Sequence, residues 1–448
     1  MSRRLGAAVI ATAVAAAVAV GAAPVAAGSA SSSPRVSAWL PWWDQARGYD
    51  SFVANADLYD QLSPFWYEMK STTQISPFPG AEDAAIISGV KEKGVALIPA
   101  VSNEFDGARV SKMLATASSR TSHVNTLVNL AIGKAYDGLD IDYENLPAAD
   151  REKFSAFVTE LAGALHAAGK VLTVAVHPKT SEPGSWNGPQ AQDYAAIGAA
   201  ADRVRVMAYD YHWSSSEAGA IAPVAWVEQV AAFAVTQIAA AKVQLGMPLY
   251  GYDWVGTSGE GVTHELAVSR MQTHGATRQW SSTDAAPWFS YQKDGATHTA
   301  WYEDGQSIAA KLPIVDTYGL AGAIFWRLGG EDPAVWTEAR ARWGGSESSA
   351  GDSTAPTAPA NATATGGIRM VSLSWGAADD TGGSGVATYR VHRKASLSGS
   401  FKVIAQSTTT SYTDKRLKKG KTYWYQVTAV DAAGNESLPS NTASAKVL

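Results

Sequence analysis

The chain has 448 residues, of which 46% are hydrophobic and 17% charged, so it is longer than one ordinary domain and able to bury large cores. Its formal net charge of -5 argues against a general nucleic-acid binder, because acidic proteins gain nothing from counterion release at phosphates. The lack of cysteine excludes disulfides and thiol catalysis, and the eight histidines show no metal-binding spacing. We therefore expect neither a metal nor another cofactor.

The N-terminal segment has the order of a secretory signal: Arg3 and Arg4, an apolar run over residues 5–20, and small residues around Ala27 and Ala30. We predict a signal peptide over residues 1–30 and a secreted, extracellular protein that does not contact a membrane after cleavage. The run is rich in alanine and weakly hydrophobic, which disfavours the alternative of an uncleaved anchor. Gly6 interrupts a partial twin-arginine pattern, so both export routes stay open.

Short apolar runs then alternate with helical stretches, which is the rhythm of βα units. One such stretch, residues 150–168, has Phe154, Phe157, Leu161 and Leu165 at helical spacing. We predict a TIM (β/α)₈ barrel over residues 36–343, whose C-terminal strand ends carry the active site. Its eight strands are expected near residues 36–43, 58–69, 95–101, 138–144, 171–177, 204–211, 243–250 and 321–326.

Residues 255–319 are too long for a loop and contain strand-like pieces, so we predict a small α+β insertion between strands seven and eight that forms one wall of a cleft. Residues 344–359 are rich in Gly, Ser, Thr and Pro and indicate a linker. Residues 360–448 alternate with a strand period and predict an all-β, seven-stranded sandwich. Trp375 and the pair Tyr423 and Tyr425 resemble those of a fibronectin type III module.

The strand expected at residues 138–144 carries an unusual row of acids. Side chains alternate along a strand, so Asp140, Asp142 and Glu144 share one face, while Asp137 has the wrong parity and is interpreted, with Gly138, as structural. Neighbouring carboxyl groups resist ionising together, which favours acid–base chemistry. A calcium loop does not fit the spacing. A solvated edge strand is the remaining bland alternative.

The segment Asp-Gly-x-Asp-x-Asp-x-Glu over residues 137–144 resembles the signature of glycoside hydrolase family 18. Three further segments in the expected order are similar to motifs of that family. They are Met207-Ala208-Tyr209-Asp210, Gly246-Met247-Pro248-Leu249-Tyr250-Gly251 and Ile324-Phe325-Trp326. Four ordered matches over residues 36–343 make coincidence improbable.

The resemblance implies that Glu144 is the general acid, that Asp142 holds the substrate acetamide and that Asp140 tunes Asp142. It further implies that Tyr209 contacts the acetamido oxygen, which acts as the nucleophile. Asp210 would contact the same sugar, which requires the strand to end or bulge there, and Trp326 would be the floor of the site. Core packing is the alternative for Tyr209 and Trp326. Substrate contacts are also predicted for Met207, Tyr250 and Trp43, the last being one of six tryptophans near strand ends (Trp42, Trp43, Trp66, Trp186, Trp213 and Trp254).

The residues after the acid, Asn145-Leu146-Pro147, and the third strand differ from typical chitinases and are more similar to spore-cortex and peptidoglycan N-acetylglucosaminidases. The expected partner is therefore an N-acetylglucosamine-containing polysaccharide, either chitin or peptidoglycan, bound by a monomer. A lectin-like member of the fold, or a structural wall protein, is the rival hypothesis. The acids and Tyr209 are retained, which favours catalysis.

Overall fold

The computed structural model describes residues 35–343, 354–380, 385–431 and 434–448. The predicted signal peptide, residues 1–30, and most of the predicted linker, residues 344–353, lie outside the described residues. Within the described ranges, no helix combines the length and apolar character needed to cross a membrane.

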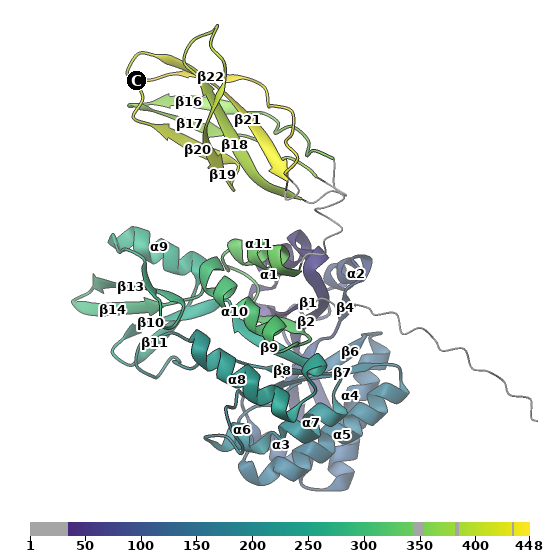
Figure 1. Ribbon diagram of the computed structural model, residues 1–448. Helices are drawn as coiled ribbons and strands as arrows, with labels where there is room; N and C mark the ends of the chain where they lie inside the picture. Colours follow the sequence, from purple (N-terminus) through teal and green to yellow (C-terminus); the bar gives the residue numbers. More distant parts are fainter. Residues whose placement is uncertain (1–34, 344–353, 381–384, 432–433) are drawn as a thin grey trace, which may run out of the picture. The chain divides into compact units, whose positions relative to one another are not determined.

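Eight parallel strands close into a barrel, which confirms the predicted architecture (Figure 1). Neighbours pair in the order β1, β2, β5, β6, β7, β8, β9 and β15, and β15 pairs with β1 to close the ring. Short strands β3 (Gln74–Pro77) and β4 (Ala96–Leu97) also pair with β2. The barrel strands are β1 (Arg35–Pro41), β2 (Tyr59–Ser71), β5 (Ala100–Ser102), β6 (Gly138–Asp142), β7 (Val171–Val176), β8 (Arg203–Val206), β9 (Val243–Pro248) and β15 (Gly322–Trp326).

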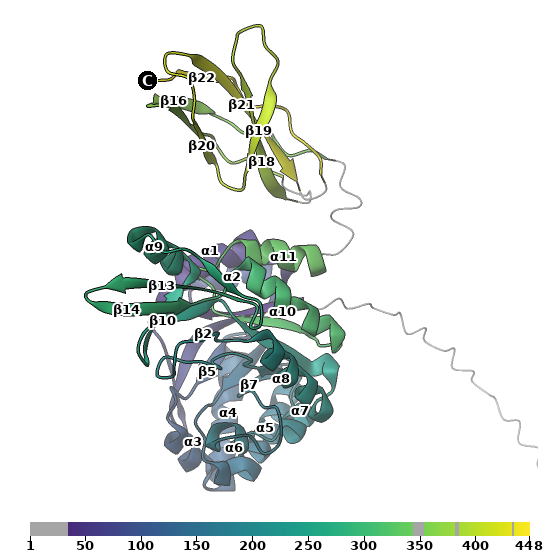
Figure 2. The same cartoon turned by 60° about the vertical axis from the view of Figure 1, so that its left-hand side comes forward.

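Helices lie outside the barrel (Figure 2). α5 shows why: its Phe154, Phe157, Leu161 and Leu165 form one buried stripe, each burial contributing about 1.5–3 kcal/mol. Four short 3₁₀ turns join elements, namely η1 (Trp42–Asp44), η2 (Ala56–Leu58), η3 (Ala148–Asp150) and η4 (Ala240–Lys242). The helices of the barrel are α1 (Gln45–Ala54), α2 (Ala84–Glu92), α3 (Gly107–Leu114), α4 (Ala117–Gly133), α5 (Arg151–Ala167), α6 (Asn187–Ala191), α7 (Tyr194–Ala200), α8 (Val224–Gln237), α10 (Gly305–Thr317) and α11 (Ala334–Trp343).

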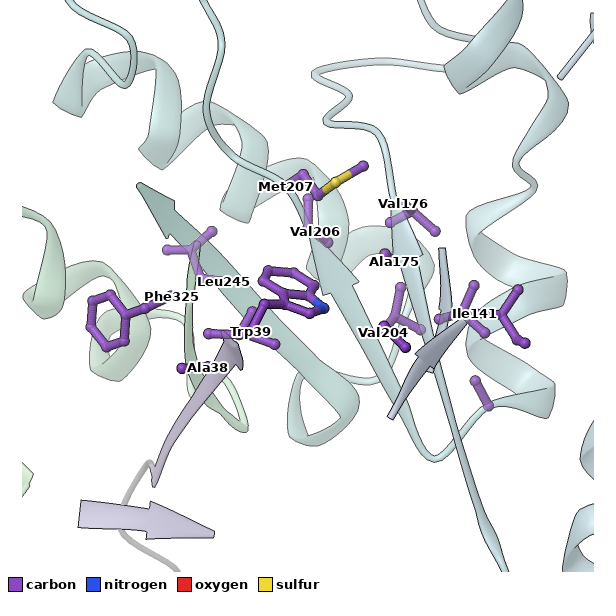
Figure 3. Packing of buried hydrophobic residues seen from close by; sticks show 14 of the residues in the cluster. Ala38, Trp39, Ile141, Ala175, Val176, Val204, Val206, Met207, Leu245 and Phe325 are labelled. Carbon is purple, nitrogen blue, oxygen red and sulfur yellow. The ribbon is translucent and has the colours of Figure 1, made fainter. Parts of the chain in front are cut away.

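The barrel core is continuous, and Figure 3 shows Trp39 among apolar residues of neighbouring strands. Several strands end earlier than predicted. β6 stops at Asp142 and β8 at Val206, and the chain then turns through residues with positive φ, Asn145 (φ 56°) and Asp210 (φ 58°). These early ends release the following side chains from strict alternation.

Between β9 and β15 the chain forms a five-stranded antiparallel sheet in the order β11, β10, β14, β13, β12, with α9 (His264–His274) against it. This excursion differs from the predicted range of residues 255–319. It begins at Tyr250, and α10 packs on α8 and α11 with the barrel helices. The strands are β10 (Tyr250–Val255), β11 (Ser258–Thr263), β12 (Gln279–Ser281), β13 (Ala286–Lys293) and β14 (Ala296–Trp301).

The C-terminal part is all-β, with its own core around Trp375, Val391 and Tyr425. A three-stranded sheet (β16, β17, β20) and a four-stranded sheet (β19, β18, β21, β22) form it. Bounds are β16 (Thr363–Gly367), β17 (Met370–Ser374), β18 (Val386–Lys394), β19 (Lys402–Ser407), β20 (Ser411–Lys415), β21 (Thr422–Asp431) and β22 (Ala443–Lys446).

Candidate active site

The acidic row lies at the C-terminal end of β6. Asp140 and Asp142 are on the strand, whereas Glu144 follows its end. Every residue of β6 is buried and β6 pairs on both sides, with β5 and with β7. The edge-strand alternative is therefore wrong.

Asp140, the deepest acid, is fully buried and saturated with donors. Trp39 Nε1 donates to its Oδ2 (2.7 Å), and Thr173 Oγ1 donates to its Oδ1 (2.5 Å). Arg205 Nη1 lies 2.8 Å from the same Oδ2, and its side chain is also fully buried. A buried charge needs such pairing to be tolerated. Asp140 is therefore held as a fixed, compensated charge beneath the site.

Arg205 is itself part of a polar network inside the barrel. Its guanidinium donates to Gln244 Oε1 (3.1 Å), Ser63 Oγ (2.6 Å) and Gln61 Oε1 (2.9 Å). Gln244 Nε2 in turn donates to Ser37 Oγ (2.8 Å). Side chains of four barrel strands, β1, β2, β8 and β9, thus form one network that fixes the ion pair between Arg205 and Asp140.

Asp142 differs from Asp140 in its surroundings. Its Oδ1 is buried and has no hydrogen-bond partner among the residues that the structure describes. Burial raises the pKa of its carboxyl well above the ordinary value, and the charges of Glu144, Asp140 and Glu104 raise it further. An orphaned buried acceptor is costly unless a ligand donates to it.

Glu144 is positioned through its backbone. Asn103 Nδ2 donates to the Glu144 carbonyl (2.8 Å), and the Glu144 N–H donates to Asn103 Oδ1 (2.9 Å). The side chain is 16% exposed. Burial raises the pKa of its carboxyl to about 8, assisted by the negative charge of Asp210. Glu144 is therefore mostly protonated at neutral pH, as a proton donor must be.

Asp210 and Tyr209 come from the segment after β8. The positive φ of Asp210 turns it out of the strand pattern, so it reaches the same site as Tyr209. Tyr250 OH donates to Asp210 Oδ1 (2.5 Å), and Tyr252 OH lies 3.3 Å from the same oxygen. Burial raises the pKa of Asp210, partly offset by these donors. Tyr209 packs edge-on against Tyr250, with ring centroids 6.2 Å apart.

Trp326 ends β15 and is held by other aromatic rings. Trp39, Trp43 and Phe65 each contact it in a T-shaped arrangement, with ring centroids 5.4–6.0 Å apart. Trp326 and Tyr250 line a cleft of about 530 Å³ between the barrel and the excursion. The other lining residues are Arg47, Gly261, Val262, Thr263, Glu265, Leu266, Ser269 and Arg327.

The structure sorts the remaining predicted residues. Trp66 and Trp254 are buried, so they belong to the core, whereas Trp43, Trp186 and Trp213 are about half exposed. Met207 is buried beside the site-forming segment. Asp137 Oδ2 accepts from Leu97 N (2.8 Å), and a Cβ on Gly138 would meet Val171 O at 2.2 Å. Both contacts are structural.

Sequence reasoning missed Arg205, Asn103 and His177 as site residues. Arg205 had a usable signal, since a charged side chain inside the buried strand Arg203-Val204-Arg205-Val206 needs a partner. His177 follows β7, and its Nδ1 lies 3.5 Å from Glu144 Oε2. This contact forms only when β6 and β7 pair in the closed barrel, so the residues around His177 in the sequence do not indicate it. No group of three His, Asp or Glu side chains suited to a metal is present in the described part of the chain.

A closed parallel barrel with a protonated carboxyl group beside an unpartnered carboxyl oxygen at its C-terminal rim offers a site suited to acid–base chemistry. The model of the family described as glycosyl hydrolases family 18 matches residues 55–331. The chain belongs to this family.

Known relatives agree with this assignment. YdhD of Bacillus subtilis strain 168, named as a sporulation-specific glycosylase, is 34% identical over 57% of this chain and 63% of its own length. A cortical fragment-lytic enzyme of the same strain is 32% identical over 48% of this chain and 51% of its own. The chain thus spans only about half to two thirds of these relatives. The crystal structure of a chitinase from Chromobacterium violaceum superposes with a TM-score of 0.65 at 26% identity, covering 68% of this chain and 98% of that one.

Proposed function

We propose that the protein hydrolyses β-1,4-linked, N-acetylglucosamine-containing polysaccharide, with peptidoglycan as the first candidate substrate and chitin as the second. The observation that carries this proposal is the pairing of a protonated acid with an unsatisfied acceptor. Glu144 holds a proton at neutral pH, and Asp142 Oδ1 beside it lacks a donor. A sugar acetamide N–H would supply that donor.

In the proposed reaction, Glu144 gives its proton to the glycosidic oxygen as the bond from that oxygen to the anomeric carbon breaks. The acetamide oxygen of the same sugar attacks the anomeric carbon and forms a cyclic oxazolinium. Asp142 accepts the acetamide N–H and balances the positive charge, while Tyr209 donates its hydroxyl to the acetamide oxygen. Water, deprotonated by the Glu144 carboxylate, then opens the ring with overall retention.

The surrounding residues support this assignment. Burial and the neighbouring carboxyl groups raise the pKa of Asp142 in the free site, and the positive charge of the oxazolinium would favour its ionised form during the reaction. Trp326, fixed at its edges by three rings, offers a face to the reacting sugar. Asp210 and Tyr250 would contact the same sugar from the C-terminal ends of β8 and β9.

Peptidoglycan is placed first because the relatives at 34% and 32% identity are named for sporulation and for cortical fragments. The similarity to a solved chitinase keeps chitin as the second candidate. The order of the C-terminal strands, three in one sheet and four in the other, supports a fibronectin type III-like module. Export through residues 1–30 and action as a secreted monomer complete the proposal.

The test compares products released from chitin oligomers and from purified peptidoglycan by the wild-type chain and by Glu144→Gln. Glu152→Gln on the exposed face of α5 is the matched control and should retain full activity. NMR of the first product should show retention, and a substrate carrying a free amine instead of the acetamide should be nearly inert. Binding of both glycans without any cleavage would instead establish the lectin-like alternative, and an inverted product would exclude the acetamide mechanism.

A further inference from the structure

The side chain and the backbone of His177 are both held in place by contacts with neighbouring residues. Its side chain is 9% exposed, and its Nδ1 faces Glu144 Oε2 at 3.5 Å. Trp186 packs edge-on against the imidazole, with ring centroids 4.6 Å apart. A Cβ on Gly188 would lie 2.3 Å from Trp186 and 2.8 Å from the His177 ring, so glycine is needed there. The ring therefore has little freedom to turn away from Glu144.

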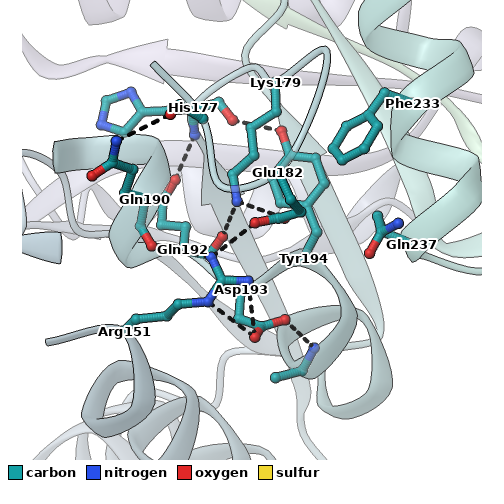
Figure 4. A network of polar contacts seen from close by, with 12 residues as sticks. Arg151, His177, Lys179, Glu182, Gln190, Gln192, Asp193, Tyr194, Phe233 and Gln237 are labelled. Carbon is teal, nitrogen blue, oxygen red and sulfur yellow. Dashed lines mark hydrogen bonds and ion pairs between the residues drawn. The ribbon is translucent and has the colours of Figure 1, made fainter. Parts of the chain in front are cut away.

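The backbone of His177 is held on both sides, as Figure 4 shows. Gln192 Oε1 accepts from its N–H (2.7 Å), and Tyr194 OH donates to its carbonyl (2.5 Å). Gln192 Nε2 also donates to the carbonyl of Tyr143, the residue before Glu144 (3.3 Å). One buried glutamine thus ties the segment of His177 to the segment of the acid.

A partly buried ionic network, centred on the buried Lys179, lies against Gln192. Lys179, whose side chain is fully buried, donates to Gln192 O (2.5 Å) and to Glu182 Oε1 (2.9 Å). Arg151 lies 3.0 Å from both Glu182 and Asp193. The charge of the buried Lys179 is compensated by these contacts, as a buried cation requires. The residues of this network do not contact the reacting atoms in the proposed mechanism. Their common effect is to hold Gln192, and through it the backbone of His177, in place.

The proton of the imidazole can be assigned from the unpartnered atom. His177 Nε2 is buried without a hydrogen-bond partner in the described residues. A buried N–H without an acceptor is rarer than a buried acceptor without a donor. The proton therefore belongs on Nδ1, where it points at the Glu144 carboxyl. The ring is neutral, because burial and the charge of Lys179 lower its pKa to about 4.

We propose that His177 is a positioning residue for the general acid, donating its Nδ1–H to Glu144 Oε2 and stabilising the carboxylate that remains after proton transfer. The inference rests on the proposed role of Glu144. The contact of 3.5 Å is long for a hydrogen bond, and such contacts commonly tighten when substrate is bound. With Oε2 held by His177, Oε1 is left to face the glycosidic oxygen and later the attacking water.

This donor opposes the carboxyl groups that surround Glu144, whereas the buried cation Arg205 is paired with Asp140 below them. These carboxyl groups reach the Asp142 and Glu144 pair from β6, from the segment after β5 and from the segment after β8, and on the far side of His177 stands one cation. The acidic groups are Asp140, Glu104 and Asp210, and the cation is Lys179. Asp210 disfavours the ionised form of Glu144, whereas an N–H from His177 favours it.

The test measures kcat, KM and the pH profile of kcat/KM on a soluble chromogenic oligosaccharide for the full chain. His177→Ala should lower kcat with little change in KM. It should also move the alkaline limb upward by about 0.5–1 pH unit, because the ionised acid has lost a donor. His177→Asn keeps an N–H near the position of Nδ1 and should restore the limb. His166→Ala, an exposed histidine on α5, is the matched control.

An independent readout is the ¹⁵N chemical shift of the His177 ring in the wild-type chain, which should show the Nδ1–H form even if the alanine variant does not fold. An Nε2–H form, or a lower melting temperature with an unchanged limb in His177→Ala, would overturn the inference. If Glu144→Gln kept normal turnover, the proposed function with Glu144 as general acid would be rejected, and the role of His177 with it. An inactive Glu144→Gln with an unmoved limb in His177→Ala rejects only the role of His177.

Discussion

Arg205→Met tests whether the ion pair between Arg205 and Asp140 is needed for the barrel to tolerate the buried charge of Asp140. The substitution keeps an unbranched side chain but leaves Asp140 as a buried charge with two neutral donors, Trp39 and Thr173. Removing one partner of a buried pair costs about 3–5 kcal/mol. At about 2 °C per kcal/mol for a domain of this size, the barrel should melt roughly 6–10 °C lower. Differential scanning calorimetry of the full chain measures this shift.

The double variant Asp140→Asn with Arg205→Met removes both charges and should recover much of the lost stability. It should not recover the activity, because Asp142 then has a neutral amide in place of the Asp140 carboxylate as its neighbour. Arg203→Met is the matched control: it lies on the same strand, and its guanidinium donates to the carbonyl of Asp202 (3.0 Å). We expect it to cost at most about 1 kcal/mol. A loss below 2 °C for Arg205→Met, or an equal loss for Arg203→Met, would refute the reasoning.

Three further predictions concern the acid and the domains. Glu144→Gln should lower kcat by about 10²–10⁴. It should also raise the melting temperature above pH 8, because a carboxyl whose folded pKa is raised to about 8 loses its stabilising contribution as pH rises through that value; a lower melting temperature there contradicts this. Tyr250→Phe removes a donor to Asp210, so Asp210 should protonate more readily and the alkaline limb of kcat/KM should move to lower pH; an upward shift excludes it. A chain ending at Trp343 should still cleave soluble oligosaccharides, since the barrel has its own core, and an insoluble or inactive product would reject that independence.

The barrel could be predicted from sequence because its strands are separate apolar runs that alternate with helices, which indicates a parallel sheet, and because eight such units and the family resemblance favour closure. The acidic row followed from parity, a property of neighbouring residues. Contacts made by closure could not be found this way. Trp39 reaches Asp140 across 101 residues, and Arg205 reaches Ser63 across 142. The tryptophans show the same limit: Trp66 and Trp43 were both expected near the ends of strands, but Trp66 lies buried within β2 and Trp43 lies half exposed in η1, after β1 has ended.

The vertical order of the acids explains how one fold keeps a proton ready at neutral pH. At the bottom, Asp140 is neutralised by Arg205, so the barrel interior tolerates its charge. In the middle, Asp142 Oδ1 has no hydrogen-bond partner among the described residues, and burial raises the pKa of the Asp142 carboxyl. At the top, burial and the charge of Asp210 raise the pKa of Glu144 to about 8. In the proposed mechanism, the pair would hold a proton until a sugar acetamide donates its N–H to Asp142. Binding of the acetamide and release of the proton are thereby linked, so a glycan lacking that group should leave the acid uncoupled from the bond it must break.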